Sequence, residues 1–181
     1  MRNRIAATAL LVVIAFVTPL ASPGSAQEGN EPEDQPVYFP HTKSYFSMME
    51  IAHHPQWSVY NKRVQTKSYR GVRGRLAIIR DKETHEFVKK TFNLSKPTWI
   101  GLRFFCRYRK LVWSDGSTHP LSDFKIWAKQ WYRNRGITCS SAHIDWMTVY
   151  YTPTSIGPVW QASGPGKGFS YALIEYPTGK E

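Results

Sequence analysis

Cysteine is scarce in this chain of 181 residues, which contains Cys106 and Cys139 and no other. Their wide separation excludes a CxxC redox motif or a zinc site built on one. The sequence also has no HExxH, no GxSxG and no phosphate-binding loop, the signatures of common metalloproteases, hydrolases and nucleotide enzymes. Two weaker catalytic patterns are present, the adjacent pair His53-His54 and the pair of His143 with Asp145. Neither has the spacing of a known catalytic or metal-binding motif, so we expect a protein that is not an enzyme.

Long hydrophobic runs are missing too, apart from one at the N-terminus. Residues 5–17 are apolar, follow Arg2 and Arg4, and precede Gly24-Ser25-Ala26. A basic start, a short apolar centre and small residues before the cleavage point are typical of a secretory signal peptide. The run is shorter than the roughly 20 residues that span a bilayer, although a retained anchor remains an alternative. We therefore predict a signal peptide over residues 1–26, secretion or export to the periplasm, and no transmembrane segment after cleavage.

The segment that follows the signal is rich in acidic residues and proline. Residues 27–42 bury too little apolar surface to fold, so we expect a disordered leader there and a single domain over residues 43–178. Because two cysteines in an oxidising compartment most often pair, we predict a disulfide between Cys106 and Cys139. No cofactor is expected.

Acidic residues are few, 13 against 24 lysines and arginines, and the formal net charge is +11. A cationic surface can serve solubility alone. It also attracts polyanions such as lipopolysaccharide, teichoic acid or acidic glycans. An exported protein rarely meets nucleic acid, so a nucleic-acid partner is not expected.

Local patterns indicate two helices early in the domain and strands later. Trp57, Tyr60 and Val64 have helical spacing in a helix predicted over residues 57–69. Asp81 opens a second helix, with acids in its first turn and Lys89-Lys90 near its end. The expected strands are 44–51, 98–102, 104–108, 110–113, 144–151, 158–161 and 168–176. Without βαβ alternation, the order predicts an α+β domain with antiparallel sheets.

Five short motifs carry a resemblance to a known family. In chain order they are Trp57-Ser58, Gly74–Ile79, Trp99–Leu102, Trp113–Gly116 and Ala172–Tyr176. Their order and spacing resemble the C-type lectin-like domain over nearly all of the predicted domain. The resemblance implies the C-type lectin-like fold, with two helices, antiparallel sheets and a long irregular loop region. We expect Gly101 to allow a neighbouring segment to approach, and Asp115-Gly116 to form a turn with positive φ.

The resemblance also implies where sugar-binding relatives hold calcium, and this chain departs from their pattern there. Those relatives carry Glu-Pro-Asn or Gln-Pro-Asp in the long loop and Trp-Asn-Asp near the end. Here the loop has no such triplet, and the second position reads Trp160-Gln161-Ala162. Calcium needs 6–8 oxygen ligands, so we expect no calcium and no other metal. Formylglycine-generating enzymes share the broad fold, but they are usually larger and use metals or reactive cysteines.

Aromatic and cationic residues remain as candidate ligand contacts. The proposed set, shared between the loop, a strand segment and the last motif, is Lys129, Trp131, Tyr132, Arg133, Arg135, Arg107, Arg109 and Trp160. Strand spacing would place Arg107 and Arg109 on one face with Arg103, opposite Tyr108 and Lys110. Arginine forks bind carboxylate, sulfate or phosphate, and rings stack on sugars. We interpret the set as a site for an anionic glycan or cell-envelope polymer. A protein-recognition surface and a solvated rim over buried tryptophans are the alternatives; the oligomeric state is undetermined.

Overall fold

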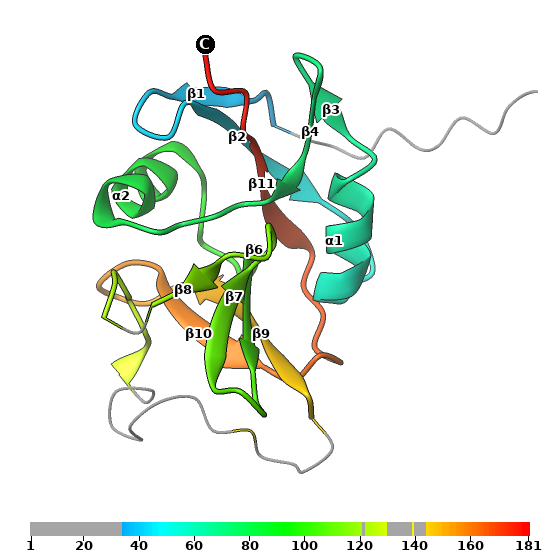
Figure 1. Cartoon of the computed structure of the whole chain (residues 1–181), viewed down its shortest axis with the longest axis vertical. Coiled ribbons are helices and arrows are strands. Elements are labelled where there is room, and N and C mark those ends of the chain that lie inside the picture. Colours follow the sequence, from blue (N-terminus) through cyan, green and yellow to red (C-terminus); the bar gives the residue numbers. More distant parts are fainter. Residues whose placement is uncertain (1–33, 121, 130–138, 140–143) are drawn as a thin grey trace, which may run out of the picture. The chain divides into compact units, whose positions relative to one another are not determined.

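The structure is a computed structural model that describes residues 34–120, 122–129, 139 and 144–181 (Figure 1). Its helices are α1 (Trp57–Val64) and α2 (Lys82–Thr91). Its strands are β1 (Val37–Phe39), β2 (Ser44–Glu50), β3 (Ser68–Tyr69), β4 (Val72–Arg73), β5 (Arg75–Leu76), β6 (Thr98–Phe105), β7 (Lys110–Trp113), β8 (Thr118–His119), β9 (Trp146–Thr152), β10 (Val159–Ser163) and β11 (Tyr171–Tyr176). The predicted α+β class with two helices is confirmed.

Two strands far apart in the sequence form the centre of the sheet. β11 pairs antiparallel with β2, and its first residues, Tyr171 and Ala172, pair parallel with β6. The predicted antiparallel pairing is found between the other described strands, and this junction adds a short parallel pairing to it. β6 also pairs antiparallel with β7 and with β9, and β9 pairs with β10. In Figure 1, α1 and α2 lie on opposite sides of β11.

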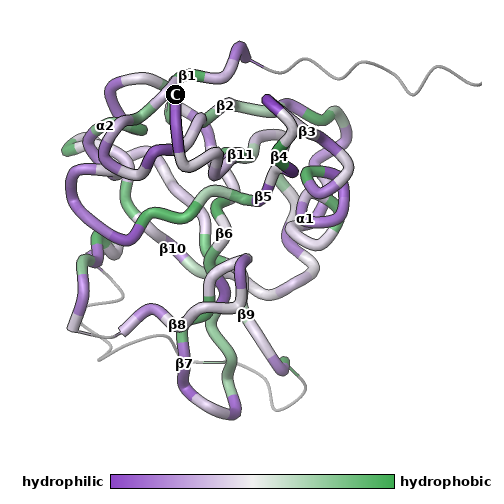
Figure 2. Tube along the Cα trace, turned by 45° about the horizontal axis from the view of Figure 1, so that its top comes forward, coloured by the Kyte–Doolittle hydropathy of each residue, from purple (hydrophilic) through white to green (hydrophobic). Residues whose placement is uncertain are grey.

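The alternation of side chains along β6 divides the core into two clusters. Ile100 and Leu102 point toward the side of α2, where they pack with Val88. Trp99 points the other way and packs with Trp57 of α1. Figure 2 shows the hydrophobic trace of β6 and of the segment that follows β5. The opposite faces expected for Trp99 and its neighbours are confirmed.

Both helices form where the sequence predicts them, but α1 is shorter. Trp57, Tyr60 and Val64 are all buried, as their spacing predicts. The helix ends at Val64 because a tight β3–β4 hairpin follows, with Arg70 at φ 50° and Gly71 at φ 78°. Such a turn with two positive φ angles matches the twist of a hairpin.

The N-terminus of α2 is capped as its sequence suggests. The Asp81 side chain accepts a hydrogen bond from the Thr84 backbone amide over 2.7 Å. This contact satisfies one of the amides that lack a partner in the first turn of a helix.

Tight packing explains two of the glycine motifs. A Cβ atom on Gly101 would lie 2.5 Å from the Leu76 carbonyl oxygen and 2.6 Å from Ser114 Oγ, so only glycine fits there. Gly116 has φ 85°, in the left-handed region that favours glycine. Both expectations are confirmed.

A buried carboxylate joins three strands near the centre of the sheet. Glu175 of β11 is 3% exposed and accepts two hydrogen bonds from Arg75 of β5, at 2.9 and 3.0 Å. It also accepts hydrogen bonds from Ser44 Oγ of β2 at 2.9 Å and from the Ile78 amide at 3.1 Å. The carboxylate is thus fully hydrogen-bonded, which compensates for its burial.

Two boundaries differ from the sequence prediction. β1 pairs with β2 although it lies within the range predicted as a disordered leader, so that prediction is wrong for residues 37–39. Further along the chain, β6 runs without a break through Phe105, and the strand predicted over residues 104–108 does not form. In the part of the chain that the structure describes, no helix has the length and apolar character needed to cross a membrane.

Candidate binding site

The β6–β7 turn, residues 106–109, carries several of the predicted contact residues. Phe105 and Lys110 pair across the end of the hairpin, which leaves a four-residue loop. Arg107, Tyr108 and Arg109 are exposed there, and the Tyr108 side chain is 64% exposed. The Arg107 guanidinium lies 5.7 Å from the centre of the Tyr108 ring. The turn and Lys110 beside it therefore present three exposed cations, of which Arg107 lies over an exposed aromatic ring.

This geometry corrects the predicted arrangement of the arginines. Arg107 and Arg109 lie in the turn, whereas Arg103 lies within β6, so the three do not share one face of a strand. The physical reason is that the hairpin reverses after Phe105, and Arg109 at φ 50° leads the chain into β7. Arg107 consequently lies next to the Tyr108 ring and not on the face opposite it.

A disulfide joins this turn to Cys139, which follows the long loop in the sequence. Cys106 is bonded to Cys139, with 6.0 Å between their Cα atoms, and the predicted pairing is confirmed. The Cys106 amide also donates a hydrogen bond to the Asp145 carbonyl oxygen over 2.9 Å. The sequence predicts two basic regions, the turn and the loop up to Arg135. The disulfide connects them along the chain, because Cys139 is only four residues beyond Arg135.

The start of the long loop is fixed on the edge of β10. The Ala128 amide donates to the Trp160 carbonyl oxygen over 2.8 Å, and the Trp160 amide donates to the Ile126 carbonyl oxygen over 2.6 Å. Lys129 follows and is exposed. The other predicted loop contacts, Trp131, Tyr132, Arg133 and Arg135, lie outside the described residues.

Trp160 is not a surface residue. It is fully buried, with ring centres of Trp113, Phe124 and Trp127 between 5.5 and 6.1 Å from its own. Edge-to-face packing of this kind stabilises a core. Its side chain has no exposed surface for a ligand, so its assignment as a ligand contact is wrong.

Two histidines, His85 and His119, are buried and hydrogen-bonded, which the sequence does not reveal. His85 Nδ1 lies 2.8 Å from the Tyr151 hydroxyl, and His119 Nε2 donates to the Phe124 carbonyl oxygen over 2.8 Å. Burial lowers the pKa of His85 and that of His119 below the ordinary 6.5. Both side chains are nearly fully buried, so they belong to the core and not to a surface site.

The catalytic candidates do not come together in the described residues. His53 and His54 adopt positive φ angles of 68° and 51°, and His54 Nδ1 lies 2.8 Å from Ser170 Oγ. His143 lies outside the described residues, so its pairing with Asp145 is not shown.

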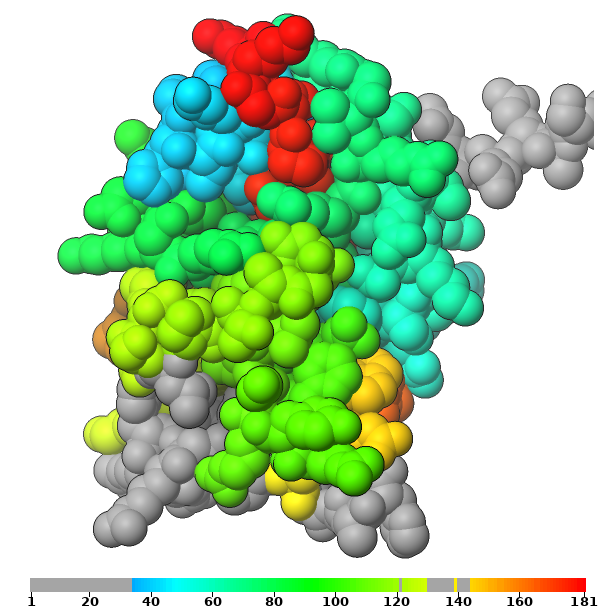
Figure 3. All heavy atoms as spheres, viewed as in Figure 1, coloured from blue at the N-terminus to red at the C-terminus, as the bar shows by residue number. Residues whose placement is uncertain are grey.

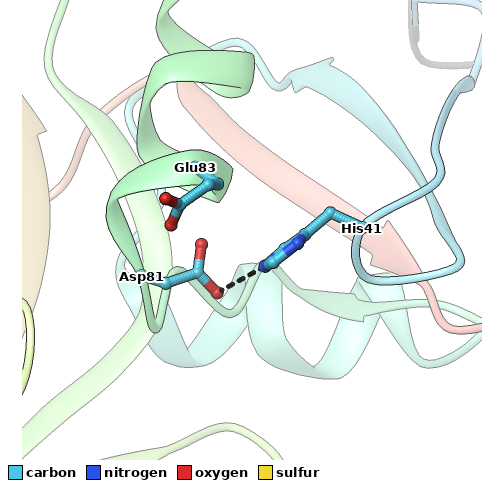
Figure 4. A group of neighbouring side chains, drawn as sticks. All are labelled: His41, Asp81 and Glu83. Carbon is cyan, nitrogen blue, oxygen red and sulfur yellow. Dashed lines mark hydrogen bonds and ion pairs between the residues drawn. The ribbon is translucent and has the colours of Figure 1, made fainter.

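One group among the described residues has the side chains to hold a metal ion. Figure 4 shows His41, from the turn between β1 and β2, facing Asp81 and Glu83 at the start of α2, with ligand atoms within 4.8 Å of one another. His41 Nε2 lies 3.3 Å from Asp81 Oδ2, while Oδ1 accepts from the Thr84 amide. Both Asp81 oxygens already have partners in an ion pair and a helix cap, which explain the cluster without an ion.

Comparison with known proteins identifies the class of this domain. The model of the C-type lectin domain matches residues 54–154, more than half of the chain. The chain therefore belongs to the C-type lectin domain family. No curated protein matches it.

Solved structures agree on the fold. The C-type lectin domain of murine dendritic cell inhibitory receptor 2 is 16% identical with a TM-score of 0.54, covering 73% of this chain and 89% of that one. The corresponding domain of cow CD23 is 19% identical with a TM-score of 0.56, covering 77% and 91%. The lectin CEL-I from Cucumaria echinata is 15% identical with a TM-score of 0.52, covering 72% and 89%. At these identities the likeness shows the fold alone.

The described residues at the position of the family's Trp-Asn-Asp motif do not fit calcium. Gln161 offers one amide oxygen, which already accepts a hydrogen bond from the Tyr150 hydroxyl over 2.9 Å. Ala162 has no ligand atom in its side chain and is 8% exposed. Calcium takes six to eight oxygen ligands, and at these two positions the strand provides one side-chain oxygen, that of Gln161.

Proposed function

We propose that this domain is a calcium-independent binding module that recognises an anionic glycan or cell-envelope polymer. The observation that carries the proposal is the Cys106–Cys139 disulfide, which joins a cationic, aromatic turn to a cysteine that lies four residues after Arg135 in the sequence. Arg107, Arg109 and Lys110 are exposed, and a cluster of like charges favours a ligand of opposite charge. Tyr108 supplies an exposed ring on which a sugar can stack.

The glycan part of the proposal has support from the fold. The murine receptor domain was solved in complex with an N-glycan, and the cow CD23 domain in the presence of an oligosaccharide. For this chain, glycan binding is inferred from that shared architecture together with its own cationic turn.

We infer calcium independence from the donor groups at the expected calcium position. Gln161 is engaged by Tyr150 and Ala162 lacks a ligand atom, so we infer that binding uses cations of the chain in place of a metal ion. A binding role without catalysis fits the family, whose domains are usually non-enzymatic. Export, inferred from the signal-like N-terminus, would place the domain where envelope polymers occur.

Retention on immobilised heparin and on lipopolysaccharide tests this proposal. We expect Arg107→Ala/Arg109→Ala to weaken retention and to make it less dependent on salt, because each lost cation removes attraction that ions screen. Lys82→Ala/Lys90→Ala is the matched control: it removes the same charge from exposed positions of α2 and should leave most of the retention intact.

Equal losses in both variants would show that net charge alone explains binding and would contradict a site at the turn. Tight binding to a protein partner that does not weaken with salt would favour the protein-recognition alternative instead.

A further inference from the structure

Arg103 occupies an unusual place in the sheet. The pairing of β6 with β9 shifts between Trp99, opposite Tyr150, and Arg103, opposite Thr148, so that β6 contains extra residues at this point. Bulges are common beside functional sites. Because Ile100, Leu102 and Phe104 all belong to the core on the side of α2, the alternation of side chains places Arg103 on the opposite face of β6.

Aromatic rings surround the Arg103 guanidinium. Its Cζ atom lies 4.8 Å from the ring centre of Trp57, 5.1 Å from that of Phe105 and 5.6 Å from that of Trp146. The Trp57 ring is held independently of Arg103, since its Nε1 donates to the Ile100 carbonyl oxygen over 2.7 Å. Figure 3 shows the β6–β7 hairpin, the start of β9 and α1 adjoining on one face of the molecule.

Among the described residues, the Arg103 guanidinium has aromatic rings around it and no anionic partner. Its buried Nε has no hydrogen-bond partner, and Arg103 forms no ion pair with the described residues. Burial lowers the pKa of the guanidinium, and no neighbouring carboxylate among the described residues offsets that effect. A buried donor without an acceptor is costly, and an absent ion is one of the explanations that such a group requires.

The side chain is nevertheless partly exposed, as are Phe105 and Trp146. A ligand from solvent can therefore reach both the cation and the edges of its aromatic walls. In the cross-strand register, Lys110 and Trp146 flank Phe105 on the same face, so a second cation lies next to this group.

We propose that Arg103 is the oxyanion-binding residue of a subsite walled by Phe105 and Trp146 and backed by the buried Trp57, which takes the carboxylate or sulfate of an acidic sugar. A planar guanidinium fork matches both oxyanions, and the partly exposed rings of Phe105 and Trp146 pack against the sugar ring that carries the charge. The inference rests on the proposed function and deepens it, because it assigns the charged group of the ligand to a particular residue.

Titration of the folded protein with glucuronate, with glucose 6-sulfate and with glucose tests the subsite, at constant ionic strength. The readouts are the NMR signals of arginine Nε–H groups and of tryptophan indoles. We expect one or both charged sugars to give saturable shifts at Arg103 and Trp146, and glucose to give none. Binding by one charged sugar alone would identify carboxylate or sulfate as the preferred group.

The variant Arg103→Gln should weaken binding of the charged sugar at least tenfold, and Arg103→Lys should also weaken it because the planar fork is lost. Lys90→Gln, an exposed lysine of α2, is the control for charge and should bind as the wild type does. Equal shifts with glucose, no saturable shift at Arg103, or unaltered binding by Arg103→Gln would each overturn the subsite. The wild-type titration decides the question even if a variant does not fold.

The polymer assay separates this inference from the proposed function. Polymer retention without any charged-sugar binding at Arg103 would remove the subsite and leave the function standing. Charged-sugar binding at Arg103 without polymer retention would retain the subsite and contradict the proposed function.

Discussion

The substitution Glu175→Gln tests the structural centre of the domain. The carboxylate of Glu175 accepts four hydrogen bonds, two from Arg75 and one each from Ser44 and the Ile78 amide, and it is 3% exposed. Glutamine keeps one acceptor oxygen and replaces the other with an NH2 group, which would face donors. The substitution also leaves the Arg75 guanidinium beside a buried amide, with the longer ion pair to Asp115 at 3.6 Å as its remaining counter-charge.

Removing one partner of a buried ion pair costs about 3–5 kcal/mol. Because the glutamine side chain would retain one acceptor and Arg75 is partly exposed, we expect the lower end, about 3 kcal/mol. For a domain of this size each kcal/mol lowers the melting temperature by about 2–4 °C, so the expected decrease is about 6–12 °C.

Urea unfolding followed by circular dichroism gives the free energy of unfolding, and a thermal scan gives the melting temperature. Glu86→Gln is the matched control, because Glu86 is exposed and its ion pairs are with Lys89 and His85 of its own helix; its melting temperature should equal that of the wild type. A double-mutant cycle with Arg75→Gln should show that the two effects are not additive. A loss below about 1 kcal/mol for Glu175→Gln would refute the reasoning that this buried network stabilises the junction of β2, β5 and β11.

Three further predictions concern stability. Replacing Cys106 and Cys139 with serine should lower the free energy of unfolding by about 4 kcal/mol in the chain-entropy model for a separation of 33 residues; an unchanged urea midpoint would contradict it. Because burial lowers the pKa of His85 and of His119 below 6.5, the unfolded chain takes up protons first on acidification. Stability should hold above pH 6.5 and fall below it, by about 1.4 kcal/mol per histidine for each pH unit until the folded pKa is reached; a flat profile between pH 7 and 5 would argue against buried neutral histidines. Gly101→Ala should cost about 1–3 kcal/mol or prevent folding, because the added Cβ would overlap the Leu76 carbonyl, and wild-type stability in thermal melts would disprove that close approach.

Features set by local chemistry could be predicted from the sequence. The cap of α2 depends on Asp81 and the amide three residues later, and the buried side of α1 depends on the spacing of Trp57, Tyr60 and Val64. The role of Gly101 could be predicted because glycine inside a strand often marks a point where a neighbouring segment approaches the backbone closely. The order of such motifs was sufficient to predict the family.

Features set by distant partners could not be predicted in this way. Where β6 ends depends on its pairing with β7 and on the disulfide, so strand-like composition through Tyr108 gave a wrong arrangement of arginines. The burial of Trp160 depends on rings contributed by two other segments, β7 and residues 122–129, and β1 depends on the free edge of β2. The aromatic surroundings of Arg103 likewise come from α1 and β9, which no spacing along β6 reveals.

The most direct test of the account is to measure binding of the folded protein to an acidic polysaccharide such as heparin over a range of NaCl concentrations, in calcium and again in EDTA. Our account predicts affinity that falls steeply with salt, because exposed cations make the contact, and curves that coincide in calcium and EDTA. Binding that requires calcium, or that does not change with salt, would contradict it.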